Sequence, residues 1–147
     1  MKARALHLRY SGYVAQTLSW EARFHLSMDL PTCILIVGRE SSFTYLMQRY
    51  SAQSAHNAVF AGQHDDILAL VRRENPAAIV LEMDRPEDAG WDLVRALKAH
   101  PKTRHIPVVL CSWDNLEPEC KEERVDVYLH KPILYHDFLS ALDRVGV

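Results

Sequence analysis

The feature that most constrains the fold of this 147-residue chain is a pair of short, uninterrupted apolar runs. Residues 33–37 read Cys-Ile-Leu-Ile-Val and residues 77–81 read Ala-Ala-Ile-Val-Leu. A strand with one face in water alternates apolar and polar residues, whereas a strand buried on both faces is apolar throughout. The two runs therefore predict central strands of a parallel sheet that helices cover on both faces.

The stretches between the apolar runs have the spacing of amphipathic helices. Two sets of apolar residues fall at i, i+3, i+4 and i+7, one after the first run and one near the end of the chain. These sets are Phe43, Leu46, Met47 and Tyr50, and Phe138, Ala141, Leu142 and Val145. Ser41 and Ser42 are expected to cap the first of these helices. A weaker strand is expected at residues 55–61 and further strands at 106–111 and 125–129, so strands and helices alternate, which predicts a doubly wound α/β domain.

Three further helices are expected between these elements. One begins near Asp65 and Asp66 and ends before Pro76. The next opens at residue 88 or 90, with Asp92, Arg95 and Lys98 on its outer face. The last is expected to be short or distorted and to begin near Asn115, because only 18 residues separate Ser112 from Lys131 and a proline lies among them.

Composition limits the classes of function. The chain is 48% hydrophobic and 24% charged with a net charge of −2, which suits one soluble domain without strong attraction to nucleic acid or membranes. The apolar runs are too short for a transmembrane helix. Cys33, Cys111 and Cys120 lack the spacing of metal ligands, so we expect no metal site and a reducing, cytoplasmic location.

The chain divides into an N-terminal extension, residues 1–31, and a domain, residues 32–147. The first 27 residues hold four basic side chains and one acidic one. Tyr13, Trp20 and Phe24 could share one face of a helix. The alternatives are an irregular extension or translation that starts at Met28.

Polar residues follow several predicted strands where functional groups of a doubly wound sheet gather, at the carboxyl ends. Gly38 and Arg39 follow the first run, Glu82 follows the central run, and Ser112 and Lys131 follow the last two strands. Pro86 comes four residues after Glu82, and Pro132 directly follows Lys131.

This arrangement over residues 32–147 resembles the receiver domain of two-component response regulators. The resemblance implies a flavodoxin-like fold with strand order 2-1-3-4-5 and a cis bond before Pro132. It aligns Glu82 with the phospho-accepting aspartate, and Gly38 and Arg39 with the pair of acids that helps to hold magnesium. It aligns Lys131 and Ser112 with the groups that grip the phosphoryl oxygens. Ser112 and Tyr128 are the switch positions, with a strand-end hydroxyl and a packed tyrosine as the alternatives.

The chain departs from the receiver pattern in its charges. The family's site has three carboxylates and one lysine, whereas the aligned positions here supply Glu82, Arg39 and Lys131. Magnesium prefers an octahedral shell of oxygens, which one carboxylate beside two cations does not offer. We therefore expect magnesium binding to be lost, no cofactor and no enzymatic activity, with Arg39 or Lys131 as the counter-ion of Glu82.

Three roles remain open for Glu82. It could mimic the phosphorylated state by touching Ser112 and Lys131, or it could pair with a cation and stabilise the fold. Residual phosphotransfer to Glu82 or Asp84 is the third, although Asp84 is expected to be a solvent-exposed loop acid. Trp113 could cover the site or anchor a partner.

The expected function is an atypical receiver domain that acts by contact with a signalling protein, either a histidine kinase or an output protein. The alternative is a metal-dependent phospho-acceptor. A small-molecule-binding flavodoxin-like protein is disfavoured, because no glycine-rich phosphate loop is present. If a homodimer forms, we expect it to use the first helix, with Tyr45 and Tyr50, or the N-terminal extension.

Overall fold

The computed structural model describes residues 33–62, 65–85 and 89–147. The predicted N-terminal extension, including its aromatic residues and the start-site alternative, lies outside the described residues. So does Asp88, one of the two predicted starts of a helix.

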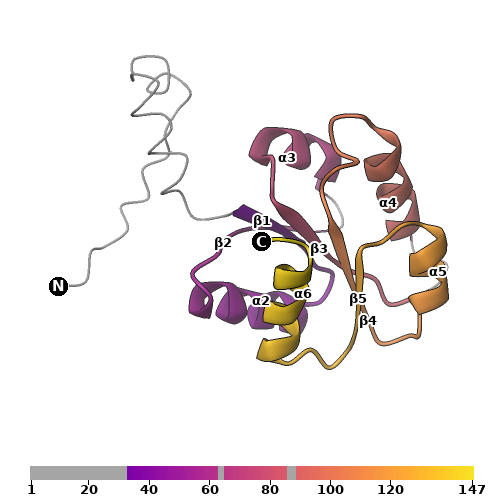
Figure 1. Ribbon diagram of the computed structural model, residues 1–147. Helices are drawn as coiled ribbons and strands as arrows, with labels where there is room; N and C mark the ends of the chain where they lie inside the picture. The colour runs from indigo at the N-terminus through magenta and orange to yellow at the C-terminus, as the bar shows by residue number, and fades with distance from the viewer. Residues whose placement is uncertain (1–32, 63–64, 86–88) are drawn as a thin grey trace, which may run out of the picture. The chain divides into compact units, whose positions relative to one another are not determined.

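Five parallel strands form one sheet in the order β2-β1-β3-β4-β5, as expected (Figure 1). The strands are β1 (Cys33–Val37), β2 (Asn57–Ala61), β3 (Ala78–Glu82), β4 (Val108–Ser112) and β5 (Val127–His130). Every residue of β3 and all but the first residue of β1 are buried, which confirms that the continuous apolar runs mark strands covered on both faces. Every residue of β4 is buried as well. Strands β3 and β4 end one residue later than predicted, so Glu82 and Ser112 are their last residues.

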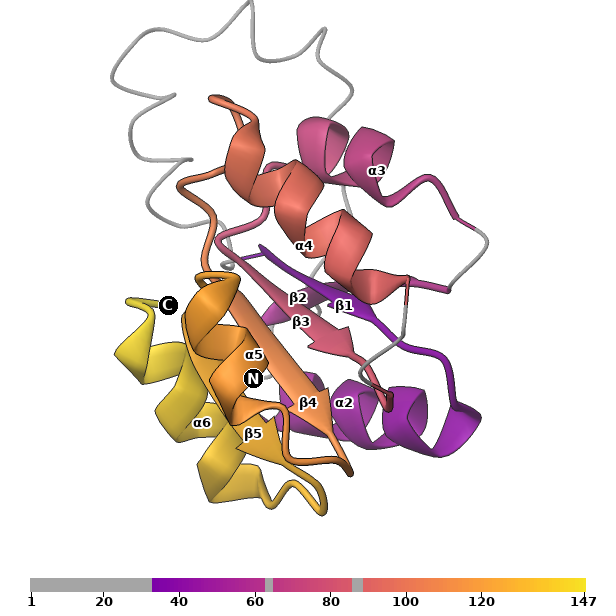
Figure 2. The same ribbon diagram turned by 90° about the vertical axis from the view of Figure 1, so that its right-hand side faces the viewer.

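Helices cover both faces of the sheet (Figures 1 and 2). They are α2 (Ser41–Gln53), α3 (Ile67–Glu74), α4 (Gly90–Ala99), α5 (Glu117–Glu122) and α6 (Tyr135–Arg144). One apolar cluster joins the sheet to α3, α4 and α5 through residues such as Val71, Val94 and Cys120. The other joins it to α2 and α6 through Met47 and Phe138. Each buried large apolar side chain contributes roughly 1.5–3 kcal/mol, so the two clusters hold the layers together.

The helices differ from the predictions at the start of α2 and on the outer face of α4. Helix α3 begins beside Asp66 as expected, and the Asp66 carboxylate caps it by accepting from the Ala69 N–H at 3.1 Å. Ser41 and Ser42 are not caps, however, because both lie inside α2 and Glu40 occupies the N-cap position. Lys98 does not face outward, since only 9% of its side chain is exposed and its ammonium contacts Asp126.

The segment between β4 and β5 is short, as predicted. Helix α5 spans six residues and has Pro118 in its first turn. It begins two residues later than expected, at Glu117. Among the described helices, none combines the length and the apolar character that crossing a bilayer requires.

Candidate functional site

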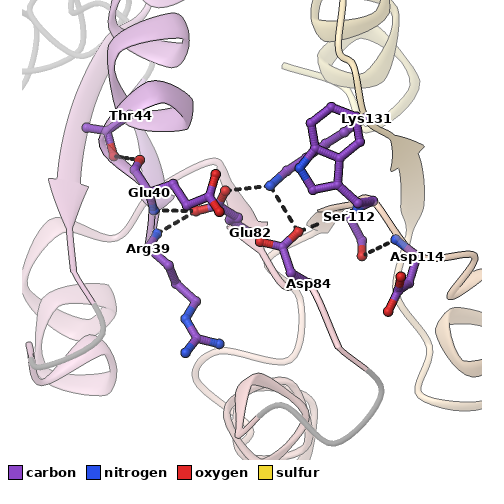
Figure 3. Close-up of polar contacts among 9 residues, drawn as sticks. Arg39, Glu40, Thr44, Glu82, Asp84, Ser112, Asp114 and Lys131 are labelled. Carbon is purple, nitrogen blue, oxygen red and sulfur yellow. Dashed lines mark hydrogen bonds and ion pairs between the residues drawn. The ribbon is translucent and has the colours of Figure 1, made fainter.

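The carboxyl edge of the sheet brings the predicted site residues together (Figure 3). Glu82 ends β3 and Ser112 ends β4, while Lys131 directly follows β5. The parallel register pairs Ser112 with His130, and the Lys131 N–H donates to the Ser112 carbonyl at 2.8 Å. The Lys131–Pro132 bond is cis, as the resemblance implies.

Glu82 and Lys131 form a buried ion pair at this edge. Lys131 Nζ lies 2.5 Å from Glu82 Oε2, and the two side chains are 5% and 0% exposed. Burial lowers the pKa of Lys131, but hydrogen bonds to Glu82 and Asp84 outweigh it, so the net shift is upward. Lys131 is therefore the counter-ion of Glu82.

The other oxygen of Glu82 binds the backbone before α2. Oε1 accepts from the N–H groups of Arg39 at 2.5 Å and of Glu40 at 2.9 Å. Within the described chain the Glu40 N-cap makes no side-chain cap bond, so Glu82 supplies the acceptor at this helix start instead. Arg39 thus meets Glu82 through its backbone, and Figure 3 shows its guanidinium directed away from the carboxylate.

Gly38 leaves little room for the side chain that the receiver pattern has there. A Cβ at this position would lie 2.7 Å from Thr44 Oγ1 and 3.2 Å from Phe43 Cδ1. Close approach of α2 to the end of β1 therefore favours glycine, and any larger residue requires the Thr44 hydroxyl to move.

These residues do not fit a magnesium ion. Both oxygens of Glu82 already face donors, one an ammonium and the other two N–H groups. Across residues 33–62, 65–85 and 89–147, no three side chains of His, Cys, Asp or Glu are grouped as metal ligands. Magnesium needs an oxygen-rich shell, which this donor set does not match.

Asp84 belongs to the site, and the prediction that it is a solvent-exposed loop acid is wrong. Its side chain is 25% exposed, and Oδ1 lies 3.0 Å from Lys131 Nζ. The same oxygen accepts a long hydrogen bond, 3.5 Å, from the N–H of Trp113. A signal was present in the sequence: residues two apart in an extended chain point the same way, so Asp84 follows Glu82 toward Lys131.

Ser112 and Tyr128 both bind the backbone of Asp114, which lies in the connection between β4 and α5. Ser112 Oγ accepts from the Asp114 N–H at 3.1 Å, and the Tyr128 hydroxyl donates to the Asp114 carbonyl. Burial raises the pKa of Tyr128. The two predicted switch positions, from β4 and β5, therefore bind one residue, whereas the bonds of Glu82 go to Lys131 and to the backbone before α2.

Trp113 both covers the site and faces solvent. Its ring centre lies 5.8 Å from Lys131 Nζ, within the range of a cation–π interaction. Phe43 lies at 5.2 Å from the same ammonium. The indole is nevertheless among the most exposed large apolar groups, at 53%.

Sequence comparison places response regulators among the relatives of this chain, although no family model matches it. The polar-differentiation response regulator DivK of Brucella anthropi is 24% identical over 118 residues, which cover 77% of this chain and 94% of the relative. Protein PilH of Pseudomonas aeruginosa is 25% identical over 76% of this chain and 95% of its own. The two-component response regulator ORR3 of Oryza sativa is 32% identical over a shorter stretch, 54% of this chain and 62% of the relative.

Solved structures share the fold. The chemotaxis response regulator CheY4 of Vibrio cholerae superimposes with a TM-score of 0.69 at 18% identity, over 79% of this chain and 99% of that one. The receiver domain of a Pseudomonas aeruginosa sensor histidine kinase, described with magnesium in its active-site cleft, gives 0.65 at 17% identity over 80% and 100%. The receiver-like part of this chain is thus similar in sequence to response regulators and shares the fold of their receiver domains.

Proposed function

We propose that this receiver domain is not phosphorylated and regulates a partner of a two-component system, a histidine kinase or an output protein, by direct contact. The observation that carries the proposal is the state of the Glu82 carboxylate. One oxygen is paired with the Lys131 ammonium and the other accepts two backbone N–H groups.

Acceptance of a phosphoryl group needs a carboxylate that can attack and a cation that offsets the charge of the incoming group. Attack by Glu82 would require a fully buried carboxylate to free one oxygen, either Oε2 from the Lys131 ammonium or Oε1 from two backbone N–H groups. The side chains that meet here are Glu82, Asp84 and Lys131, and the lysine ammonium pairs with both carboxylates. The position that a magnesium ion would need beside these carboxylates is thus taken by the lysine.

The contacts support a stabilising role for Glu82 over mimicry of the phosphorylated state. Mimicry predicts that Glu82 touches Ser112. Ser112 Oγ instead accepts from Asp114, and Glu82 reaches back toward α2. We therefore propose that the site holds one fixed arrangement and that a partner recognises the surface around it.

The domain is proposed to act in the cytoplasm and without enzymatic activity of its own. Its three cysteines are free thiols, and burial raises the pKa of Cys111 and of Cys120. Buried thiols with raised pKa values remain reduced and unreactive, which suits a reducing compartment.

The test is phosphorylation of the full chain by phosphoramidate with magnesium, read by intact mass. We expect no stoichiometric gain of a phosphoryl group under conditions in which a receiver with an intact acidic pair, treated in parallel, is modified. Magnesium-dependent phosphorylation on Glu82 or Asp84, located by peptide mass spectrometry, would contradict the proposal and favour the phospho-acceptor alternative.

A further inference from the structure

Strand β2 forms one edge of the sheet and pairs with β1 (Figure 1). The Gly38 N–H donates to the Ala61 carbonyl at 3.1 Å, so the backbone groups of Ala61 face β1. Backbone groups of successive strand residues alternate in direction, so those of Val59 also face β1, whereas those of Ala58 and Phe60 point outward. Within residues 33–62, 65–85 and 89–147, nothing pairs with these outward N–H and C=O groups.

Bonds within the chain close this open stretch at both ends. At its start, the His56 N–H donates to the Ser51 carbonyl at 3.1 Å. At its end, the Gly62 N–H donates to Asp65 Oδ2 at 2.7 Å. The open part of the edge is therefore short and has Val59 at its centre.

The side chains of β2 do not discourage pairing with another strand. The strand reads Asn-Ala-Val-Phe-Ala and contains neither a charged residue nor a proline. Exposed edge strands usually carry charges, prolines or bulges that prevent the addition of a further strand. Phe60 packs against the apolar cluster of α2 and α6, and Val59 packs against that of α3, α4 and α5. The edge is thus an extended strand held on both faces with free backbone groups, which is what strand addition requires.

A second copy of this chain fits the edge because the open stretch is self-complementary. In antiparallel pairing about a twofold axis at Val59, Ala58 of each copy faces Phe60 of the other, and each such pair exchanges two N–H···O bonds. His56 of one copy then lies opposite the end of the other copy's strand, where Asp65 is bound. A carboxylate favours the charged form of a nearby imidazole, so opposite charges meet at both ends of the pairing.

We propose that two copies of this chain form a homodimer by antiparallel pairing of their β2 strands, which joins the two sheets into one. This surface differs from those expected from the sequence, α2 with Tyr45 and Tyr50 or the N-terminal extension. Tyr50 is engaged within its own chain, since its hydroxyl donates to the Ile133 carbonyl at 2.9 Å. The pairing uses no residue of the carboxyl-edge site, so it stands apart from the proposed function.

The experiment measures assembly and the exposure of the β2 edge on the full chain. Sedimentation equilibrium over a range of protein concentrations gives the dissociation constant of the dimer. Amide hydrogen exchange, followed by NMR over the same range, measures the protection of the Ala58 and Phe60 N–H groups. We expect both groups to exchange freely in the monomer and slowly in the dimer.

The first variant removes part of the proposed pairing. Ala58→Pro deletes an outward N–H and leaves the bonds to β1 in place, because proline is tolerated where the N–H of an edge strand faces solvent. Half of the hydrogen bonds between the two copies are then lost. The dissociation constant should therefore rise at least about tenfold.

Charge reversal tests the antiparallel direction of the pairing. His56→Asp brings two carboxylates together at each end and should raise the dissociation constant about threefold to tenfold. Addition of Asp65→Lys to this variant restores opposite charges and should recover much of the affinity. His105→Asp is the matched control, since His105 is an exposed histidine before β4, and β1 and β3 separate that strand from β2. It should dimerise as the unaltered chain does.

Three results would overturn the inference. The unaltered chain could remain monomeric up to about 1 mM. It could dimerise while the Ala58 and Phe60 N–H groups exchange freely, which would place the interface elsewhere. These groups could also be protected in the monomer, which would show that the chain covers its own edge. Variants are compared only where urea titration shows that they fold, and if Ala58→Pro does not, the exchange data of the unaltered chain and the charge variants decide.

Discussion

The two ends of the β4–β5 pair each carry a lysine, a carboxylate and a backbone N–H, yet they differ in solvation. At the carboxyl edge, Lys131 meets Glu82 at 2.5 Å with both side chains almost entirely buried. At the amino edge, Lys98 meets Asp126 at 2.9 Å, and 39% of the aspartate side chain remains exposed. Asp126 also accepts from the Val108 N–H at 2.8 Å, which ties the starts of the two strands together.

The comparison shows that similar ion pairs contribute differently to stability according to their access to water. A solvated carboxylate that loses its lysine is rehydrated, so the amino-edge pair contributes only moderately to the stability of the fold. A buried carboxylate that loses its lysine has no water to replace it, so the carboxyl-edge pair must be kept or removed as a unit.

Removal of Lys131 should have the largest effect. Lys131→Met leaves the buried charge of Glu82 without its counter-ion, and the free energy of unfolding should fall by about 3–5 kcal/mol in urea titrations. The double variant Lys131→Met with Glu82→Gln should recover much of this loss. Lys121→Met, at an exposed lysine, is the control, and a loss at Lys131 no greater than at Lys121 would show that the pair is solvated.

The packing beside the site gives the next largest effect. Gly38→Ala places a Cβ 2.7 Å from Thr44 Oγ1 and should cost about 1–3 kcal/mol, since tightly packed positions resist added methyl groups. Thr44→Ala in the same chain should relieve most of that cost. Gly62→Ala is the matched control, because among the described residues its Cβ would approach nothing closer than Asp65 Oδ2 at 3.8 Å. Equal stability of the two glycine variants would refute the close approach of α2.

Removal of the amino-edge lysine should cost less than removal of Lys131. Lys98→Met frees Asp126, which keeps its bond to the Val108 N–H and its access to water, so we expect a loss of about 1 kcal/mol. Parallel urea titrations of Lys98→Met and Lys131→Met measure the two losses in the free energy of unfolding. Equal losses for the two lysines would remove the distinction between the two ends.

The smallest expected effect is the loss of the stability that Lys131 contributes at the carboxyl edge when the pH becomes alkaline. Because the folded-state pKa of Lys131 is raised, its contribution is complete below the ordinary lysine value of about 10.4 and is lost as the pH rises through the folded value. Burial raises the pKa of Cys120 to about 12, which acts in the same direction from about pH 8.5 upward. The urea midpoint should therefore be flat near neutral pH and fall above it.

The double variant Lys131→Met with Glu82→Gln isolates the share of the ion pair in this decline. It keeps Cys120, so it should lose less stability than the unaltered chain between about pH 9.5 and about pH 11.5, roughly one unit on either side of the ordinary lysine pKa. Parallel declines of the two proteins would assign the whole effect to other groups.

The sequence predicted much of the fold, since burial on both faces leaves a direct signature in the residues. The uninterrupted runs marked β1 and β3, and the short spacing around Pro118 marked a short α5. Because the strands are parallel and in register, it also followed that Glu82, Ser112 and Lys131 meet at one edge.

Apart from shifts of one or two residues in the limits of strands and helices, the errors concern side chains whose partners lie far along the chain. The N–H before α2 is accepted by Glu82, 42 residues away, so local serines were a misleading signal for the cap. Lys98 lies against Asp126, 28 residues on, and this contact covers a side chain that periodicity placed outside. Asp84 leaves the surface for Lys131, 47 residues on.

By itself, then, the sequence determined the layers, the strand order through its resemblance to receivers, and which residues end the strands. The tertiary structure decided which cation pairs with Glu82, where the second oxygen of Glu82 binds, and that Asp84 joins them. The physical reason is that apolar burial depends on spacing along one element, whereas the pairing of charges depends on distances of about 3 Å between elements that only the packed fold brings together.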